Sequence, residues 1–273
     1  MKMSLKTKII LYILLTIFLL YFLFPFIYLF ISAFKTEAEA VAYPPAWLPE
    51  KWLWTNFVKA WNSQPFATFF KNSVLVTVGC VLGTLVSSTL VAYGFARFNF
   101  KGKNILFIIL LSTMMIPWDV TMIPQYMEFK ALGWINSLKC LIIPSWFGSA
   151  YYIFLLRQFM MGVPKELDEA ARIDGANSFQ IFFDIMVPIC RPCLILVAVL
   201  QMIVVWNDYL GPLIFLQDRS KYTLALGLAA FTGVHTETVI PQLCITIIMI
   251  IPTVLVFLLA QKYIVEGVSG AIK

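Results

Sequence analysis

The stretch KELDEAARIDGANSFQIFFDIMVP, residues 165–188, is a polar, charge-rich segment between two long apolar runs. Its first half has the charge order of a short helix. Glu166, Asp168 and Glu169 would lie near the positive N-terminal end of the helix dipole, and Arg172 would lie near its negative end. The segment is therefore expected to be ordered rather than a loose connection.

Two short helices with a sharp turn between them are predicted here. Pro164 suits the first position of the first helix. Gly175 is suited to the left-handed conformation that ends many helices. Asn177 and Gln180 have the spacing of a cap that opens a second helix leading into the next apolar run.

The first helix is predicted to present a face of small residues. Leu167, Ala170, Ala171 and Asp174 share one face at helical spacing, and the two alanines make a shallow surface that a partner protein could approach closely. The alternative is an amphipathic loop resting on lipid headgroups. Such a loop favours Lys or Arg opposite bulky apolar residues, whereas acids dominate here, so we favour docking of a partner protein.

Composition places the whole chain in a membrane. Hydrophobic residues make up 61% of the chain, charged residues 12%, and the mean hydropathy is +0.87. Soluble domains have roughly 45–50% apolar and about 25% charged residues. Backbone groups in lipid must be satisfied within the segment, which favours helices, and the apolar runs are too long and uniform for the strands of a β-barrel.

Six transmembrane helices are predicted, and the third and fifth are interrupted by polar residues or proline. The predicted spans are residues 9–33, 72–96, 104–126, 140–156, 185–216 and 239–261. The first apolar run is much longer than the core of a signal peptide, so we expect it to be retained as a span.

Basic residues set the expected orientation. With the N-terminus inside, more of the 20 Lys and Arg fall on the inner side, and the short loop 97–103 carries three of them and no acid. Both termini and the segment 165–188 are then cytoplasmic. The net charge of +6 is attributed to this topology and to anionic lipid. A nucleic-acid site is not expected, because no basic patch with interleaved aromatic residues is present.

One motif identifies a family. EAARIDGA at 169–176, followed by IMVP at 185–188, resembles the EAA motif of ABC-importer permeases. The longer wording LRQF…VPKELDEAARIDGA is similar to the carbohydrate-uptake branch, and in particular to MalG-like permeases of the binding-protein-dependent inner-membrane component family. Further collinear motifs are FFKNSVLVT at 69–77, AYGFARFNFKGK at 92–103, LGWINS at 132–137, WND at 206–208 and GVSGAIK at 267–273.

This resemblance, which covers nearly the whole chain, implies an architecture and partners. The fold would be the all-α type I ABC-importer permease fold, a polytopic membrane protein with six transmembrane helices and a cytoplasmic coupling-helix loop. Residues 1–70 would hold the first helix and an extracytoplasmic loop, residues 71–263 the permease core, and residues 264–273 a cytoplasmic tail. The partners would be a second homologous permease, two ATP-binding cassette subunits and an extracytoplasmic solute-binding protein, in a bacterial cytoplasmic membrane.

The resemblance also assigns roles. The residues that would contact the ATPase are Glu169, Ala170, Ala171, Asp174 and Gly175. The chain has no G-x-x-x-x-G-K-[ST] phosphate loop, so it is expected to be a transport subunit rather than an enzyme. ATP and Mg would be bound by the partner ATPase subunits, and no cofactor by this chain.

Polar residues inside spans are candidates for the solute pathway. A charge there costs about 2.5–3.5 kcal/mol on insertion scales and suggests function. The candidates are Trp206, Asn207, Asp208 and Tyr209, together with Asp119. Two alternatives stay open: the polar groups could only cap a broken helix, or the companion permease could supply the solute contacts.

The predicted cargo is a sugar or oligosaccharide, with a non-sugar polar solute such as glycerol phosphate as the alternative. An ion-driven secondary transporter would also have broken helices and buried carboxylates, but it would not need the EAA loop. A membrane enzyme would need a convergent catalytic cluster, and His235 is the only histidine.

Two smaller patterns have structural interpretations. Gly79 and Gly83 form a small-xxx-small pattern that would let the second span pack closely on a neighbour. Cys190 and Cys193 form a single Cys-x-x-Cys without the further ligands that a structural zinc site needs, so no metal site is predicted.

Overall fold

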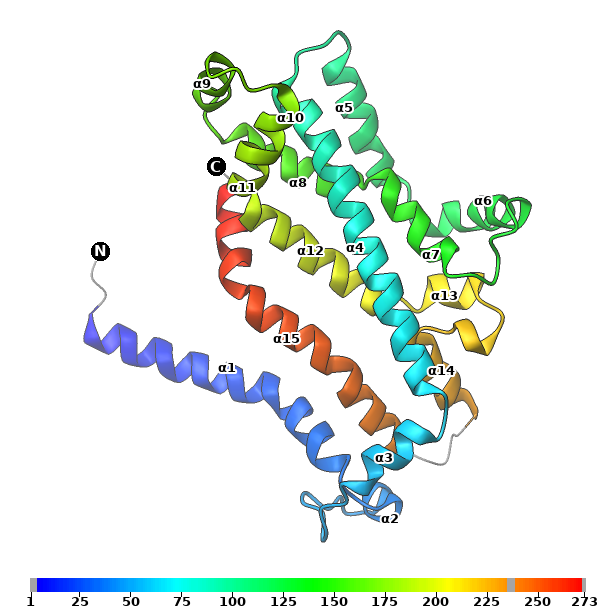
Figure 1. The fold of residues 1–273 in the computed structure, drawn as a ribbon. Helices are drawn as coiled ribbons and strands as arrows, with labels where there is room; N and C mark the ends of the chain where they lie inside the picture. Colours follow the sequence, from blue (N-terminus) through cyan, green and yellow to red (C-terminus); the bar gives the residue numbers. More distant parts are fainter. Residues whose placement is uncertain (1–3, 235–238, 272–273) are drawn as a thin grey trace. The chain divides into compact units, whose positions relative to one another are not determined.

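The computed structural model describes residues 4–234 and 239–271, and all regular secondary structure in that part of the chain is helical (Figure 1). His235 lies outside the described residues. The chain divides into two units, which we describe separately. Unit 1 consists of Met1–Phe66 and Leu228–Ile251, and unit 2 of Ala67–Gly227 and Pro252–Lys273.

Unit 1 begins with a long apolar helix whose side chains are almost all exposed. Its elements are α1 (Leu5–Ser32), α2 (Glu37–Val41), α3 (Thr55–Asn62), the later part of α14 (Leu224–Val234) and the earlier part of α15 (Ile240–Ala271). The Ser4 side chain caps α1 by accepting from the N–H of Thr7. With 28 residues, α1 is long enough to cross the hydrocarbon core of a bilayer.

The loop after α1 is fixed by polar contacts within unit 1. The carboxylate of Glu37 accepts from the backbone N–H groups of Val239 and Ile240, at 3.0 and 3.2 Å. These N–H groups belong to the start of α15, where no intrahelical partner exists and a negative charge is favourable. Lys35 is buried, and its Nζ donates to the carbonyl oxygen of Ala46 at 2.6 Å. The loop is thus tied to the beginning of α15.

Unit 2 contains the remaining helices. These are α4 (Phe66–Arg97, apart from its first residue), α5 (Lys103–Ser112), α6 (Trp118–Ala131), α7 (Lys139–Ile142), α8 (Ala150–Met161), α9 (Glu166–Ile173), α10 (Ser178–Gln180), α11 (Val187–Ile189), α12 (Arg191–Trp206), α13 (Leu210–Phe215), the start of α14 and the end of α15. A π-helical turn (Ile181–Met186) joins α10 to α11.

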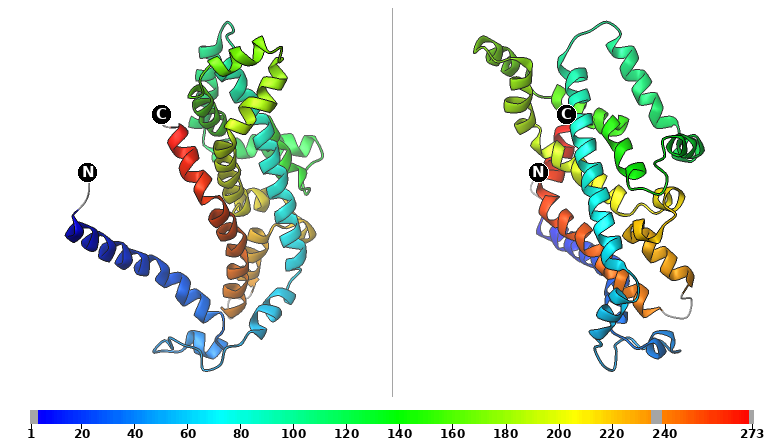
Figure 2. Two further views of the ribbon diagram at one scale, coloured as in Figure 1. Left: turned by 60° about the vertical axis from the view of Figure 1, so that its left-hand side comes forward. Right: turned by 45° about the vertical axis from the view of Figure 1, so that its right-hand side comes forward.

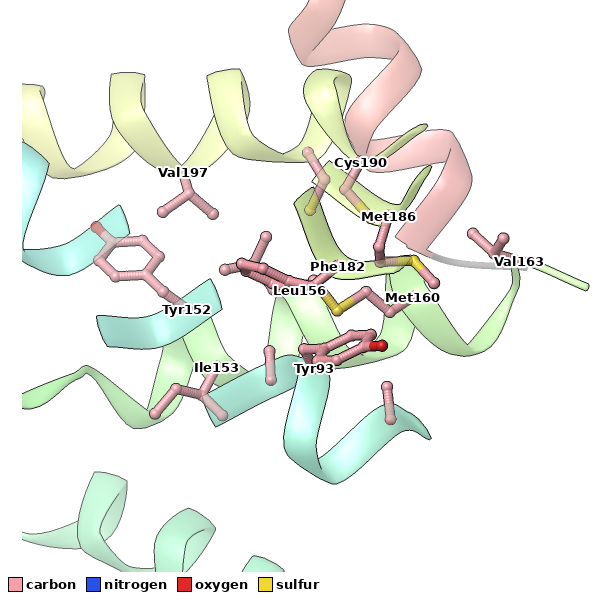
Figure 3. Close-up of a cluster of buried hydrophobic side chains, with 13 residues drawn as sticks. Tyr93, Tyr152, Ile153, Leu156, Met160, Val163, Phe182, Met186, Cys190 and Val197 are labelled. Carbon is pink, nitrogen blue, oxygen red and sulfur yellow. The ribbon is translucent and has the colours of Figure 1, made fainter. Parts of the chain in front are cut away.

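The core of unit 2 lies where α4, α8, the π-helical turn and α12 meet. Leu156 and Met160 of α8 and Met186 of the π-helical turn are fully buried there, and Phe182 packs beside them (Figure 3). Cys190 and Cys193 are buried in the same cluster. Phe182 and Met186 belong to the segment 165–188, so the segment that carries the EAA motif is packed into this core.

The structure agrees with the prediction of six spans. Four helical stretches are long and apolar enough to cross a membrane, among the described residues, and two bent pairs bring the number to six if each is one span. The pair Lys103–Met115 and Trp118–Ala131 is bent by 97°, as Figures 1 and 2 show. This break follows from Pro117, which the sequence had marked.

Several details differ from the predicted spans. The pair Ser178–Ile189 and Arg191–Trp206 is bent by 74° near Cys190, a break that was not predicted. The predicted break at 206–208 is present, because α12 ends at Trp206. Helix α15 continues to Ala271, past the end of the predicted sixth span at residue 261.

The glycines of α4 have the predicted packing role. A Cβ at Gly79 would lie 2.8 Å from the side chain of Ile142, and a Cβ at Gly83 would lie 2.5 Å from the ring of Trp146. The neighbour of the small-residue face is thus the segment around α7 of the same chain. Gly94, on the same helix, has nothing within 4 Å of its Cβ position.

We therefore expect Gly83→Ala to destabilise the protein and Gly94→Ala not to. The added methyl at Gly83 forces the indole of Trp146 to move, and overpacking of this kind costs about 1–3 kcal/mol. Thermal unfolding of the purified protein in one detergent compares the two variants. Equal melting temperatures for both would contradict the close packing at Gly83.

Candidate coupling loop and solute pathway

The first helix of the polar segment is ended by a tight hydrogen-bonded turn. Helix α9 ends at Ile173, and Gly175 follows with a φ of +87°, as predicted for a left-handed cap. The N–H of Ala176 donates to the carbonyl of Ala171 at 2.9 Å, and the N–H of Gly175 donates to that of Arg172 at 3.1 Å. This is the Schellman pattern. Helix α9 begins at Glu166, two residues later than Pro164 had suggested.

The second helix opens with the predicted capping box. The Asn177 side chain accepts from the N–H groups of Phe179 and Gln180, both at 3.0 Å. In return the Gln180 side chain accepts from the N–H of Asn177 at 2.8 Å. Because both ends of the turn between α9 and α10 are capped, the segment has a defined shape that can transmit force.

Most of the charged and small residues of α9 face outward. Glu169, Ala170 and Asp174 are exposed, while Ala171 is only 8% exposed and packs inward. The residues predicted to share one exposed face are therefore divided: Ala170 and Asp174 are exposed, whereas Ala171 packs inward in this conformation. Ile173, 86% exposed, adds an apolar side chain to the outer surface.

One acid of α9 is buried in an ion pair. Asp168 Oδ2 lies 3.2 Å from Nε of Arg97, the last residue of α4. From the sequence, Arg97 is only a signal of topology and Asp168 only a favourable charge at a helix N-terminus. No local pattern joins two residues so far apart in the chain, so the pairing was not visible before the structure.

A second residue of α4 contacts the other side of the segment. The hydroxyl of Tyr93 donates to the carbonyl of Ser178 at 3.4 Å, and its ring packs against Phe182 with centroids 5.0 Å apart. The C-terminal end of α4 thus contacts the segment on both sides of the turn. Figures 1 and 2 show α9 at the same end of unit 2 as the end of α4.

We expect the cap at Gly175 to be required for an ordered α9. Gly175→Ala places a Cβ in the left-handed region at a cost of about 1–2 kcal/mol, which corresponds to about 5–30-fold faster amide exchange across the last turn of α9. Gly175→Asn should be milder, since asparagine tolerates this conformation. Hydrogen–deuterium exchange checks both, and an unchanged rate in the alanine variant would contradict the role of the cap.

Most of the residues predicted for the solute pathway make packing or capping contacts at the helix break after α12. Trp206 is 3% exposed and packs edge-on against Phe70, with centroids 5.6 Å apart. The Asn207 side chain donates to the carbonyl of Ile203 at 2.8 Å, and Asp208 Oδ1 accepts from the N–H of Gly211 at 3.1 Å. These are the capping contacts that the sequence analysis had left as an alternative.

Asp208 also lines a cavity of about 400 Å³ together with Trp118 and Gln125 of α6. Apolar residues of α7, α12 and α13 complete its walls. Trp118 and Gln125 were not singled out from the sequence, although their spacing of seven places them on one helix face. Asp119 does not line this cavity. Tyr209 is 38% exposed and lies outside it as well.

No metal-binding geometry is found within residues 4–234 and 239–271. No group of three or more His, Cys, Asp or Glu side chains is placed to hold an ion there. Cys190 and Cys193 are free thiols in the apolar core.

Comparison with known proteins gives consistent matches. Residues 79–269 match the family described as binding-protein-dependent transport system inner membrane component. The probable ABC transporter permease protein YurM of Bacillus subtilis is 34% identical over 255 residues, covering 86% of this chain and 84% of the relative. The arabinooligosaccharides transport system permease protein AraQ of Halalkalibacterium halodurans is 35% identical over 207 residues, covering 76% and 74%.

The fold also matches a solved structure. A chain from the crystal structure of a bacterial ABC transporter involved in the import of the acidic polysaccharide alginate superimposes with a TM-score of 0.82 and 24% sequence identity. The match covers 96% of this chain and 99% of that chain.

Proposed function

The chain belongs to the family of inner membrane components of binding-protein-dependent transport systems, and from this premise we propose that it is a permease subunit of an ATP-driven importer for a sugar or oligosaccharide. It is a multi-pass membrane protein with the fold of an ABC-importer permease. A second permease would supply the other half of the pathway, and a solute-binding protein would deliver the cargo from outside.

The cargo class is supported by a relative and by the cavity. A relative 35% identical to this chain is a permease of an arabinooligosaccharide transport system. The cavity beside α6 combines an indole, an amide and a carboxylate, from Trp118, Gln125 and Asp208. A few polar groups in an otherwise apolar pocket fix the orientation of a ligand. Hydroxyl groups of a sugar can donate to the carboxylate and to the amide oxygen, and they can accept from the amide N–H.

Coupling to ATP is proposed to occur through α9. The exposed charges of α9 and its C-cap are three acids, Glu166, Glu169 and Asp174, and one base, Arg172, and Ala170 leaves room for close approach. The chain has no phosphate loop of its own, so ATP and Mg would bind to two ATPase subunits that dock here. Basic residues in the loop 97–103 support a cytoplasmic location for α9 and for both termini.

The proposed transport cycle is alternating access. Moving an outward/inward equilibrium from 1:99 to 99:1 requires about 5.5 kcal/mol of differential interaction. The docked ATPases would supply it through the capped segment around α9. The observation that carries this proposal is the exposed surface of α9, held in a fixed shape by the Schellman turn that ends α9 and the capping box that opens α10.

Reversal of one exposed charge should therefore uncouple transport. Glu169→Lys is expected to leave membrane insertion intact but to abolish uptake and weaken retention of the ATPase during purification. Glu128→Lys, at an exposed glutamate of α6, is the matched control and should behave as wild type. Normal uptake and normal ATPase association in the Glu169 variant would refute the docking surface.

The cavity makes a separate prediction about solute. Gln125→Leu removes an amide that a hydroxyl-rich solute can bond, a loss of about 1 kcal/mol or roughly fivefold in uptake. The ATPase association should not change. The control is Gln261→Leu on α15, whose amide donates to its own helix at Leu258. Full uptake in reconstituted liposomes by the Gln125 variant would place the solute contacts in the companion permease.

A further inference from the structure

We propose that Arg97 and Asp168 are positioning residues for energy coupling: their ion pair fixes α9 to α4, so that a displacement of α9 moves the transmembrane helix. The inference rests on the proposed function, because it concerns how the coupling helix passes motion onward. Neither residue would touch the ATPase or the solute. Their effect would be exerted through the orientation of α9.

Arg97 contacts the polar segment at two places and the connection that leads into it at a third. Its Nε lies 3.2 Å from Asp168 within α9. Its terminal NH2 donates to the carbonyl of Val163, before α9, at 3.1 Å, and lies 3.9 Å from Sδ of Met186 in the π-helical turn after α10. A planar guanidinium offers several donors in a fixed geometry, whereas a lysine ammonium offers a single point of charge. One rigid side chain therefore contacts the connection into α9, the helix itself and the turn behind it.

The burial of the pair indicates a role in orientation rather than in stability alone. The side chains of Arg97 and Asp168 are only 2% and 9% exposed. Buried ion pairs often stabilise a fold no better than apolar side chains of the same size, because both charges lose their hydration. Asp168 Oδ1 also has no hydrogen-bond partner within the described residues. Arg97 Nε has none either, so the pair is a charge–charge contact at 3.2 Å. An apolar pair would not provide this attraction, and a displaced α9 loses it.

Tyr93 makes the attachment two-sided. Arg97 holds the part of the segment up to Asp168, and Tyr93 holds the part after the turn through Ser178 and Phe182. Both residues belong to the C-terminal end of α4. A push on α9 would thus reach α4 directly, through contacts on both flanks of the Gly175 turn.

The test measures solute transported per ATP hydrolysed in proteoliposomes that hold the whole transporter. We expect Arg97→Met and Asp168→Leu each to lower this ratio by about tenfold, equivalent to about 1.4 kcal/mol, and to make ATP hydrolysis less dependent on the loaded binding protein. Arg97→Lys should have an intermediate ratio. Asp184→Asn, at an exposed acid of the π-helical turn, is the control and should match wild type.

The double variant Arg97→Met/Asp168→Leu separates positioning from folding. It leaves no unpaired buried charge, so we expect it to recover the abundance and thermal stability lost in the single variants while the transport ratio stays low. Recovery of a normal ratio in the double variant, or a normal ratio in either single variant, would overturn the positioning role. If Glu169→Lys fails to uncouple, the proposed docking surface on α9 is wrong; if only the Arg97 and Asp168 variants stay coupled, the positioning proposal alone is wrong.

Discussion

A backbone N–H or C=O inside a membrane must find its partner within the protein, and two interruptions of the helices in unit 2 meet this requirement through side chains. Asn207 and Asp208 close the gap between α12 and α13 by bonding to Ile203 and Gly211. The side chain of Asn136 accepts from the backbone N–H groups of Gln217 and Asp218, beyond α13. Polar residues at these breaks satisfy backbone groups, and Asp208 also forms part of the wall of a cavity.

The same requirement applies to the buried charge at the C-terminal end of α4. A buried guanidinium needs acceptors, and the segment around α9 supplies a carboxylate and a carbonyl. The shape of the segment is then determined twice: locally by the caps at Gly175 and Asn177, and over a distance by contacts with α4. Transmission of motion through this segment would need both kinds of contact. A rigid segment that is not attached to α4 could not move it, and an attached segment that is not rigid would deform instead.

The structure could be predicted from the sequence wherever the interaction that determines it is local. The glycine that adopts a positive φ, the Asn–Gln capping box, the proline break before α6 and the glycine face of α4 each follow from residues within a few positions of one another. It could not be predicted wherever the interaction joins distant segments. Three features depend on tertiary packing: the ion pair of Arg97 with Asp168, the buried position of Ala171, and the cavity that both Gln125 and Asp208 line. The bend near Cys190 was not predicted either, although Pro188 and Pro192 lie on its two sides.

The central claim is that the exposed face of α9 contacts an ATPase subunit, and site-specific photo-crosslinking tests it most directly. A photoreactive residue placed at Ala170 should crosslink to the ATPase in intact cells. The same residue at Tyr43, which is 96% exposed in the loop after α1, should not. A crosslink at Ala170 whose yield changes when ATP is bound is the result the account predicts. Crosslinking of the ATPase at Tyr43, or none at Ala170 in an actively transporting complex, would contradict it.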